Sequence, residues 1–295
     1  VYGEDQTAAV SFGRFHTKEY ATRFVYMPGV DKNGAYMTCG WRDLGGWPTM
    51  YGTRTSYGRI YRGAQLNGTG DQRSAYATDE ALNIASKYLG IKYEIDLRNS
   101  TESGSQTTSY INGCTYGKHE ITSYAHLFKN TPTTQFASIF SQLAKEENYP
   151  VYFHCVAGAD RTGSLSFFIN SLLGVGMEDL FRDFELKTFA QSGGTRNRED
   201  LSNWNEEVYT FTPGRYLSDT SFNALLEACN SLYPETTVWS EKMYRIMNEY
   251  FGVSATDLNN FLRINLGFVP EKFQNKAKAT VNFVNCDLEP MLVYK

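Results

Sequence analysis

The stretch from Tyr149 to Gly163 constrains the fold of this chain more than any other part of the sequence. It opens with β-branched and aromatic residues in a row, Val151–Phe153, which is typical of a short buried strand. A loop follows, and Gly174 later stands where a helix C-cap belongs. Between them, apolar residues recur with the spacing of one helix face, at Leu165, Phe168, Ile169, Leu172 and Leu173. The pattern predicts a strand, a tight loop and a helix.

The predicted loop carries residues suited to binding an anion. Backbone N–H groups at a helix N-terminus point toward a bound anion. Cys155 opens the loop and Arg161 follows six positions later. The helix dipole and the charge of Arg161 both lower the pKa of a thiol at position 155, and a thiolate facing a phosphate is a nucleophile for attack on phosphorus. A buried structural cysteine at a strand end is the alternative.

The sequence His154-Cys155, five residues, then Arg161-Thr162 resembles the signature loop of the cysteine-dependent protein tyrosine phosphatase superfamily. The loop variant with Ala157-Gly158 and then Asp160-Arg161-Thr162-Gly163 resembles that of a bacterial subgroup of tyrosine/lipid phosphatases, which includes a secreted mycobacterial enzyme. The resemblance spans residues 39–268. The flanking motifs that agree are Trp41–Trp47, Ile60–Gly63, Asp96–Arg98 with Glu102, and Leu172–Leu180.

The resemblance implies a phosphatase mechanism with a covalent intermediate. Cys155 attacks the phosphoryl group and forms a cysteinyl-phosphate, while Arg161 grips the phosphoryl oxygens. Thr162 donates its hydroxyl to the Cys155 sulfur, and His154 orients the loop without transferring protons. No metal or organic cofactor is needed. The residues expected to bind the phosphoryl group are Val156, Ala157, Gly158, Ala159 and Thr162.

The leaving oxygen needs a proton from a general acid. Many tyrosine phosphatases supply it from a Trp-Pro-Asp loop, whereas here Trp47-Pro48 is followed by Thr49. In the subgroup that this chain resembles, the aspartate before the loop arginine is the proposed acid, which corresponds to Asp160. Asp96 is the reserve candidate, because it ends a predicted strand beside the signature loop.

The expected substrate is a phosphorylated protein or a small phosphomonoester. The mycobacterial relative has a lysine, associated with lipid-phosphate activity, where this chain has Ala159, so phosphotyrosine is the default. An inositol-polyphosphate or phosphoinositide phosphatase is the alternative, with Lys187, Arg196 and Arg198 as candidate basic residues around the mouth. A phosphate-binding module without turnover and a rhodanese-like sulfurtransferase are further alternatives, which the intact Cys155 to Arg161 spacing argues against.

The rest of the pattern predicts an α/β fold, with a mixed, mostly parallel sheet and helices on both faces. Strands are expected at 93–97 and 117–122, and helices at 78–89, 134–143, 178–189, 221–232, 237–251 and 256–266. Asp96 and Arg98 follow a strand at the ligand edge, where they contact the substrate or support the loop. Arg42 and Asp43 either line the pocket or form a structural ion pair that steadies a loop.

Three segments are expected. Residues 1–38 form a β-rich addition with strand-like stretches at 8–15 and 23–27. Residues 39–270 form the catalytic domain, and residues 271–295 form a tail that pairs with the N-terminal segment into a small sheet. The polar run 190–217 is either a substrate-covering lid or a plain surface insertion.

Composition limits the class of protein further. The chain has 295 residues and a net charge of −4, without a Lys/Arg run suited to nucleic acid and without an apolar stretch of membrane-span length. The five cysteines lack zinc-site spacing. The Tyr-, Asn-, Thr- and Gly-rich composition resembles exported bacterial proteins, which points to a secreted or periplasmic location without fixing it. The missing initiator methionine indicates a processed or trimmed product.

Overall fold

The computed structural model of the chain describes residues 24–31, 33–38, 40–67, 76–189, 222–274, 278–281 and 291–294. A five-stranded sheet lies at its centre, in the order β3-β4-β8-β6-β7. Strand β3 is antiparallel to β4, and the other neighbours are parallel. The predicted mixed, mostly parallel sheet is confirmed. The strands are β3 (Arg42–Asp43), β4 (Ile60–Gly63), β6 (Tyr93–Asp96), β7 (Thr115–Lys118) and β8 (Val151–His154).

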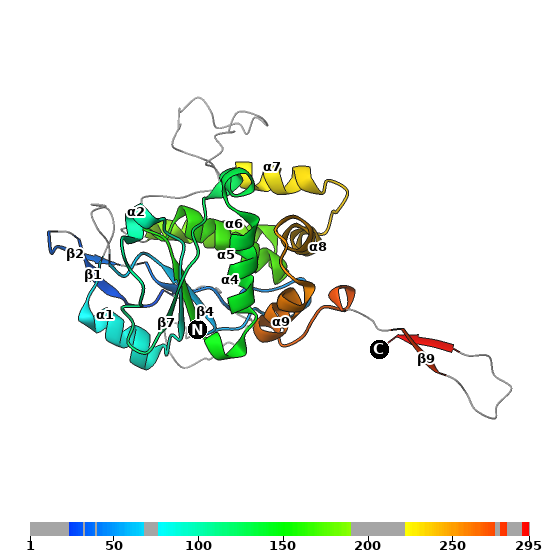
Figure 1. The fold of residues 1–295 in the computed structure, drawn as a ribbon, viewed down its shortest axis with the longest axis horizontal. Coiled ribbons are helices and arrows are strands. Elements are labelled where there is room, and N and C mark those ends of the chain that lie inside the picture. Colours follow the sequence, from blue (N-terminus) through cyan, green and yellow to red (C-terminus); the bar gives the residue numbers. More distant parts are fainter. Residues whose placement is uncertain are drawn as a thin grey trace, which may run out of the picture.

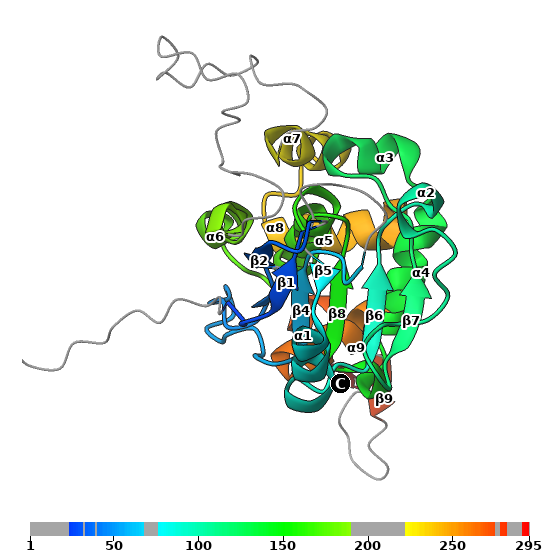
Figure 2. The ribbon, with the colours of Figure 1, turned by 90° about the vertical axis from the view of Figure 1, so that its left-hand side faces the viewer.

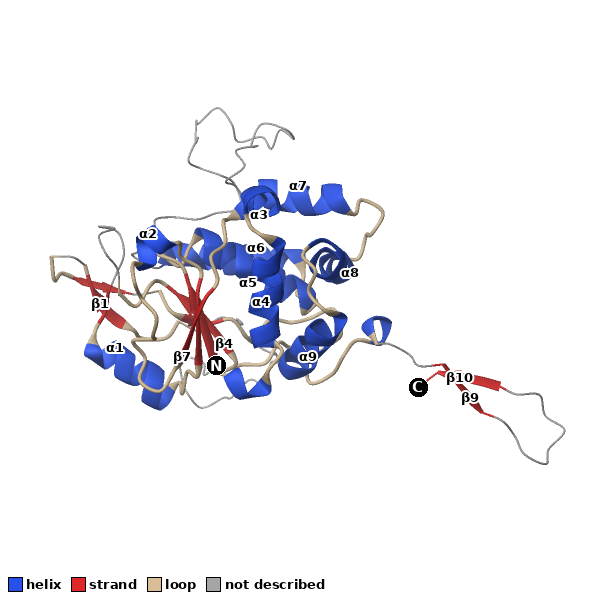
Figure 3. Cartoon of the chain, viewed as in Figure 1, coloured by secondary structure: helices blue, strands red, loops and turns tan. Residues whose placement is uncertain are grey.

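Helices cover both faces of this sheet, as predicted (Figure 1). One face is covered by α4 (Thr133–Leu143) and α5 (Asp160–Leu172), with α8 (Trp239–Arg245) packed on α5 and α9 (Ala255–Leu266) packed on α4, and the other face is covered by α1 (Asp79–Asn83). Figure 3 shows the sheet edge-on between these two layers. The central strands β4, β6 and β8 are therefore buried along their whole length.

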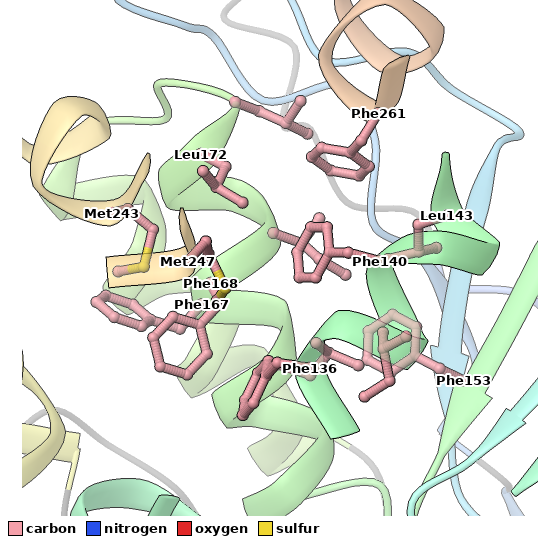
Figure 4. Close-up of a cluster of buried hydrophobic side chains, with 14 of the residues drawn as sticks. Phe136, Phe140, Leu143, Phe153, Phe167, Phe168, Leu172, Met243, Met247 and Phe261 are labelled. Carbon is pink, nitrogen blue, oxygen red and sulfur yellow. The ribbon is translucent and has the colours of Figure 1, made fainter. Parts of the chain in front are cut away.

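The larger core fills the space between the sheet, α4 and α5, and it extends between these helices and α8 and α9 (Figure 4). Alternation along β8 explains which residues enter it: Val151 and Phe153 point into this core, whereas Tyr152 points into the smaller core beneath α1. Phe153 and Phe168 of the signature helix both belong to this cluster. Burying one such aromatic ring contributes about 2–3 kcal/mol. The core thus fixes β8 and α5, the two elements that flank the signature loop.

The remaining elements lie around this framework. They are α2 (Ser100–Ser103), α3 (Leu127–Asn130), α6 (Met177–Glu185), α7 (Phe222–Leu232), the π-helical segments η1 (Ile84–Tyr88) and η6 (Ile246–Tyr250), and the 3-10 turns η2 (Tyr124–His126), η3 (Glu146–Asn148), η4 (Leu186–Phe189) and η7 (Glu271–Phe273). No helix in this described part of the chain combines the length and the apolar character needed to span a bilayer.

Most predicted elements are present, with shifted ends. Thr78 caps α1 through its hydroxyl, as predicted, but the helix widens into η1 after Asn83. The strand predicted at 117–122 lies at Thr115–Lys118, because it pairs in register with Tyr93–Asp96 of β6. The polar run 190–217 lies outside the described residues.

The two ends of the chain form separate small sheets among the described residues. Strand β1 (Pro28–Val30) pairs with β2 (Tyr36–Thr38) and with β5 (Tyr76–Ala77). In the tail, β9 (Lys278–Val281) pairs with β10 (Met291–Tyr294). The stretch 8–15 lies outside the described residues, and the stretch predicted at 23–27 is not a strand where it is described, because only Phe24 forms an isolated bridge, with Arg42. The pairing of the two ends and the boundaries at 38 and 270 therefore stay predictions.

Candidate active site

The signature loop connects the end of β8 to the start of α5, at the carboxyl edge of the parallel strands. Figure 2 shows β8, β6 and β7 pointing the same way, with α2 beyond the end of β6. Cys155 directly follows β8, and α5 begins at Asp160. Gly158 has a φ of 66°, and a Cβ there would lie 2.4 Å from the carbonyl group of Gly63. Glycine is required at this position because both the backbone angle and the close approach exclude a side chain.

The Cys155 thiol is buried, with 3% of the residue exposed. Burial raises its pKa, but the charge of Arg161 and the neighbouring polar groups of Thr162 lower it, and the net pKa lies below the ordinary value of a thiol. The two other described free cysteines lack these neighbours, and burial raises the pKa of both Cys114 and Cys229. Position 155 therefore favours the thiolate.

Arg161 is held by Glu102 through two parallel hydrogen bonds of 2.5 and 2.8 Å. Glu102 is fixed in turn, because it exchanges two 3.0 Å hydrogen bonds with Asn99 in a capping box at the start of α2. Glu102 therefore binds the two terminal nitrogens of the guanidinium, Nη1 and Nη2. The edge formed by Nε and one terminal nitrogen is directed elsewhere and suits two phosphoryl oxygens.

Asp160 stands at the N-terminus of α5 beside Arg161. The Tyr124 hydroxyl donates a 2.6 Å hydrogen bond to Asp160 Oδ1. Tyr124 has a φ of 53°, the only positive φ at a non-glycine position among the described residues. Its backbone N–H also donates to the Ser164 hydroxyl, one turn further along α5, at 2.9 Å. This strained backbone holds the tyrosine against the first turn of the signature helix.

The buried His154 side chain links the signature loop to strand β6. His154 lies 3.0 Å from the Cys155 carbonyl through Nδ1 and 2.9 Å from Glu94 through Nε2. Both nitrogens face acceptors, so both must carry hydrogen, as in an imidazolium. Burial lowers the pKa of His154, but the charge of Asp96 and the bond to Glu94 raise it overall. His154 is thus placed to orient the loop.

Asp96 and Arg98 form a buried ion pair under the loop. Arg98 donates from Nε and Nη2 to both carboxylate oxygens, and the Tyr116 hydroxyl donates to Asp96 at 2.8 Å. Burial raises the pKa of Asp96, but His154 and Arg98 together lower it to about 2. Arg98 also bonds to the Gln65 side chain. Both side chains are buried, and the contacts that they make are with other parts of the chain.

Arg42 and Asp43 also make structural contacts. Arg42 pairs with Asp183 of α6 in a fully buried position. Asp43 accepts hydrogen bonds from the backbone N–H groups of Gly45 and Gly58 at 2.8 and 2.7 Å, which steadies the loop between β3 and β4. Lys187 is buried, with 2% exposed, and so it does not place a positive charge on the surface around the entrance to the active site.

Several residues around the loop were not anticipated from the sequence. Glu94, Asp183, Gln65 and Tyr124 each contact the loop or one of its supporting side chains. Glu102 was noted as part of a motif, without its role as the partner of Arg161. A usable signal existed for Glu94: a carboxylate between the aromatic and aliphatic residues Tyr93 and Ile95 of a buried strand needs a partner.

The strand, loop and helix therefore bring a buried cysteine and an arginine together at one end of the sheet. A sequence profile of the tyrosine phosphatase family matches residues 38–274. The match covers most of the chain, so this chain belongs to the tyrosine phosphatase family. It is a phosphatase that acts on a phosphorylated substrate.

Two solved structures are similar to the chain. One is the core catalytic domain of the PP-IP phosphatase SIW14 from S. cerevisiae in complex with citrate, with 18% identity, a TM-score of 0.33, and coverage of 47% of this chain and 77% of that one. The other is described as the Siw14 catalytic core, with 17% identity, a TM-score of 0.33, and coverage of 44% and 71%. The comparison with curated proteins gives no match.

Proposed function

We propose that this protein is a cysteine-dependent phosphomonoester hydrolase that forms a cysteinyl-phosphate at Cys155, and that its substrate is phosphotyrosine. The observation that carries the proposal is the environment of the Cys155 sulfur. It lies at the N-terminus of α5, beside the Arg161 charge and two hydrogen-bond donors of Thr162. The tyrosine/lipid phosphatase subgroup of bacteria, with a loop of the same form, is the proposed affiliation.

The first step transfers the phosphoryl group from the substrate oxygen to sulfur. The phosphoryl oxygens lie on the backbone N–H groups of residues 156–161 and on the open edge of Arg161. The Cys155 thiolate donates an electron pair to phosphorus, the bond from phosphorus to the ester oxygen breaks, and Asp160 gives its proton to that oxygen. The product alcohol or phenol then leaves.

The second step hydrolyses the sulfur–phosphorus bond. Asp160, now a carboxylate, takes a proton from water as the water oxygen attacks phosphorus. The electron pair of the breaking bond returns to Cys155 as a thiolate. The Thr162 hydroxyl and N–H stabilise that thiolate, which makes sulfur a better leaving group. Inorganic phosphate is released and the enzyme is restored.

Asp160 suits the general acid better than Asp96 does. It starts α5 beside the loop arginine, and the Tyr124 hydroxyl holds it in place. Asp96 is fully buried, it is paired with Arg98 and Tyr116, and its pKa of about 2 keeps it ionised at neutral pH. Asp96 would have to break its contacts with Arg98 and Tyr116 before it could carry a proton to the leaving oxygen.

A substrate panel tests the proposed function. We expect a phosphotyrosine peptide to be hydrolysed faster than phosphoinositides and phytate, and orthovanadate to inhibit that hydrolysis. This chain has Ala159 where the mycobacterial relative has a lysine associated with lipid-phosphate activity, and Lys187 is buried. Both features favour phosphotyrosine over the more highly charged substrates. Preferred turnover of phytate or a phosphoinositide would move the assignment to the inositol-phosphate alternative. Binding of vanadate without turnover of any member of the panel would make the protein a phosphate-binding module.

The replacement Asp160→Asn tests the general acid. We expect about 10²–10⁴-fold slower hydrolysis of phenyl phosphate, whose leaving oxygen needs a proton. Hydrolysis of a nitro-substituted aryl phosphate should slow far less, because that leaving group is already stable as an anion. The measurement is kcat/KM on both substrates for this variant and for Asp96→Asn. Equal losses in Asp160→Asn, with a leaving-group-dependent loss in Asp96→Asn, would transfer the role to Asp96.

A further inference from the structure

Two arginines are buried opposite each other behind the signature loop. The register of β3 and β4 places Arg42 directly across from Arg62, and both side chains are fully buried. Like charges in this position destabilise a sheet. Asp183 of α6 bonds to both, through Oδ2 to Arg62 at 2.7 Å and through Oδ1 to Arg42 at 3.3 Å. One carboxylate thus forms ion pairs with two buried cations.

This cluster is poorly suited to a purely stabilising role. A single arginine would satisfy Asp183, and the second adds a buried positive charge with a large desolvation cost. Arg42 Nη1 and Arg62 Nε are buried without a hydrogen-bond partner in the described part of the chain. Unsatisfied buried donors are rare in folded proteins and call for an explanation. The presence of a second buried arginine is explained if one of the two holds a neighbouring part of the chain in place.

Arg62 contacts the signature loop directly. Its Nη2 donates a 3.2 Å hydrogen bond to the carbonyl oxygen of Gly158, while Nη1 holds Asp183. Gly158 sits at the middle of the loop, at positive φ and packed against the backbone of Gly63 at the end of β4. Arg62 also comes from β4, so one strand supports the loop through both its backbone and its side chain.

The direction of this carbonyl group sets the direction of the next amide. In a trans peptide unit, the C=O of one residue and the N–H of the following residue point in opposite directions. An outward Gly158 carbonyl, held by Arg62, therefore turns the N–H of Ala159 toward the inside of the loop. If the peptide rotated, a carbonyl oxygen would face the bound anion and repel it.

We infer that Arg62, held in place by Asp183, is a positioning residue for the signature loop, which it keeps receptive to the phosphoryl group by fixing the Gly158 carbonyl outward. The inference rests on the proposed function, since it assigns Arg62 a part in the same anion site. Arg62 does not touch the substrate. Its effect reaches the phosphoryl group through the peptide between Gly158 and Ala159.

The test compares three replacements of buried cations by methionine. Arg62→Met removes the bond to Gly158. Arg42→Met removes a buried arginine from the same cluster but keeps the bond between Arg62 and Gly158. Lys242→Met controls for the general effect of losing a buried cation, because Lys242 lies in α8 and bonds to Asn230. The readouts are the inhibition constant of orthovanadate, kcat and KM on an aryl phosphate, and the melting temperature.

We expect Arg62→Met to weaken vanadate inhibition by about tenfold or more, the usual effect of losing a hydrogen bond from a charged donor. Arg42→Met should weaken it much less, although both variants lose thermal stability. Equal weakening in the two arginine variants, or unchanged vanadate inhibition in Arg62→Met, would overturn the inference. If Arg62→Met does not fold, Arg62→Lys replaces it. The lysine keeps the charge beside Asp183, but its single ammonium cannot hold both partners in the arginine geometry, so the same tenfold weakening is expected.

Failure of this inference is distinguishable from failure of the proposed function. Wild-type protein that hydrolyses aryl phosphates and is inhibited by vanadate, together with Arg62 variants of normal affinity, contradicts the positioning role alone. Wild-type protein without turnover or vanadate binding contradicts the proposed function itself.

Discussion

Replacement of Cys155 by serine is expected to reduce hydrolysis of aryl phosphates by at least about 10⁴-fold, the scale of loss when a covalent nucleophile is removed. A serine hydroxyl is far less acidic than this thiol, whose pKa is lowered by Arg161 and Thr162 against the effect of burial. The loop N–H groups and Arg161 remain, so vanadate should still bind. The measurements are the rate of phosphate release and vanadate binding followed by calorimetry.

Cys229→Ser is the matched control for this variant. Cys229 is as buried as Cys155 but lies in α7, and burial raises its pKa. Its replacement should lower stability without a comparable loss of rate. Residual activity of Cys155→Ser within tenfold of the wild type would exclude Cys155 as the nucleophile.

The second large effect is expected for Arg161→Lys, with a loss in kcat of about 10²–10³-fold, as for removal of one donor to the transition state. Lysine keeps the positive charge, but one ammonium cannot make two parallel bonds to Glu102 and also grip two phosphoryl oxygens. The charge near Cys155 also moves, so the thiolate is less stabilised. Steady-state kinetics on an aryl phosphate measure the loss.

Arg182→Lys serves as the control, because Arg182 lies on α6 and pairs with Asp179 near the surface. Near-normal kcat in Arg161→Lys would show that charge alone is sufficient at this position. Glu102→Gln adds a finer comparison. It keeps the shape of the partner but removes its charge, and we expect a smaller loss than in Arg161→Lys because the arginine remains free to bind the phosphoryl group.

The elements that carry the chemistry were predictable because their signals are local. Val151–Phe153 and the helical spacing after Leu165 predicted β8 and α5, and Thr78 was expected as a cap and acts as one. The π-helical segments at Ile84–Tyr88 and Ile246–Tyr250 were missed, since a period of 3.6 residues describes only the regular helix. Local sequence patterns thus predicted the strands and helices of the framework, but they misplaced the ends of several of them.

The supports of the loop were not predictable, because they depend on contacts distant in sequence. Arg161 and Glu102 are 59 positions apart, and Arg62 and Asp183 are 121 apart. Which buried carboxylate meets which cation depends on strand order and on the docking of α6. A single sequence shows that a buried charge needs a partner but does not say which one it meets.

Rapid mixing of wild-type protein with an aryl phosphate, followed by quenching within the first turnover and peptide mass spectrometry, tests the central claim most directly. The claim is that the phosphoryl group passes through Cys155. The account predicts that the peptide containing Cys155 gains the mass of one phosphoryl group on sulfur, that the signal decays as phosphate appears, and that Cys155→Ser shows none. A phosphoryl group on His154 or on any other side chain, or phosphate release without a covalent species, would contradict the account.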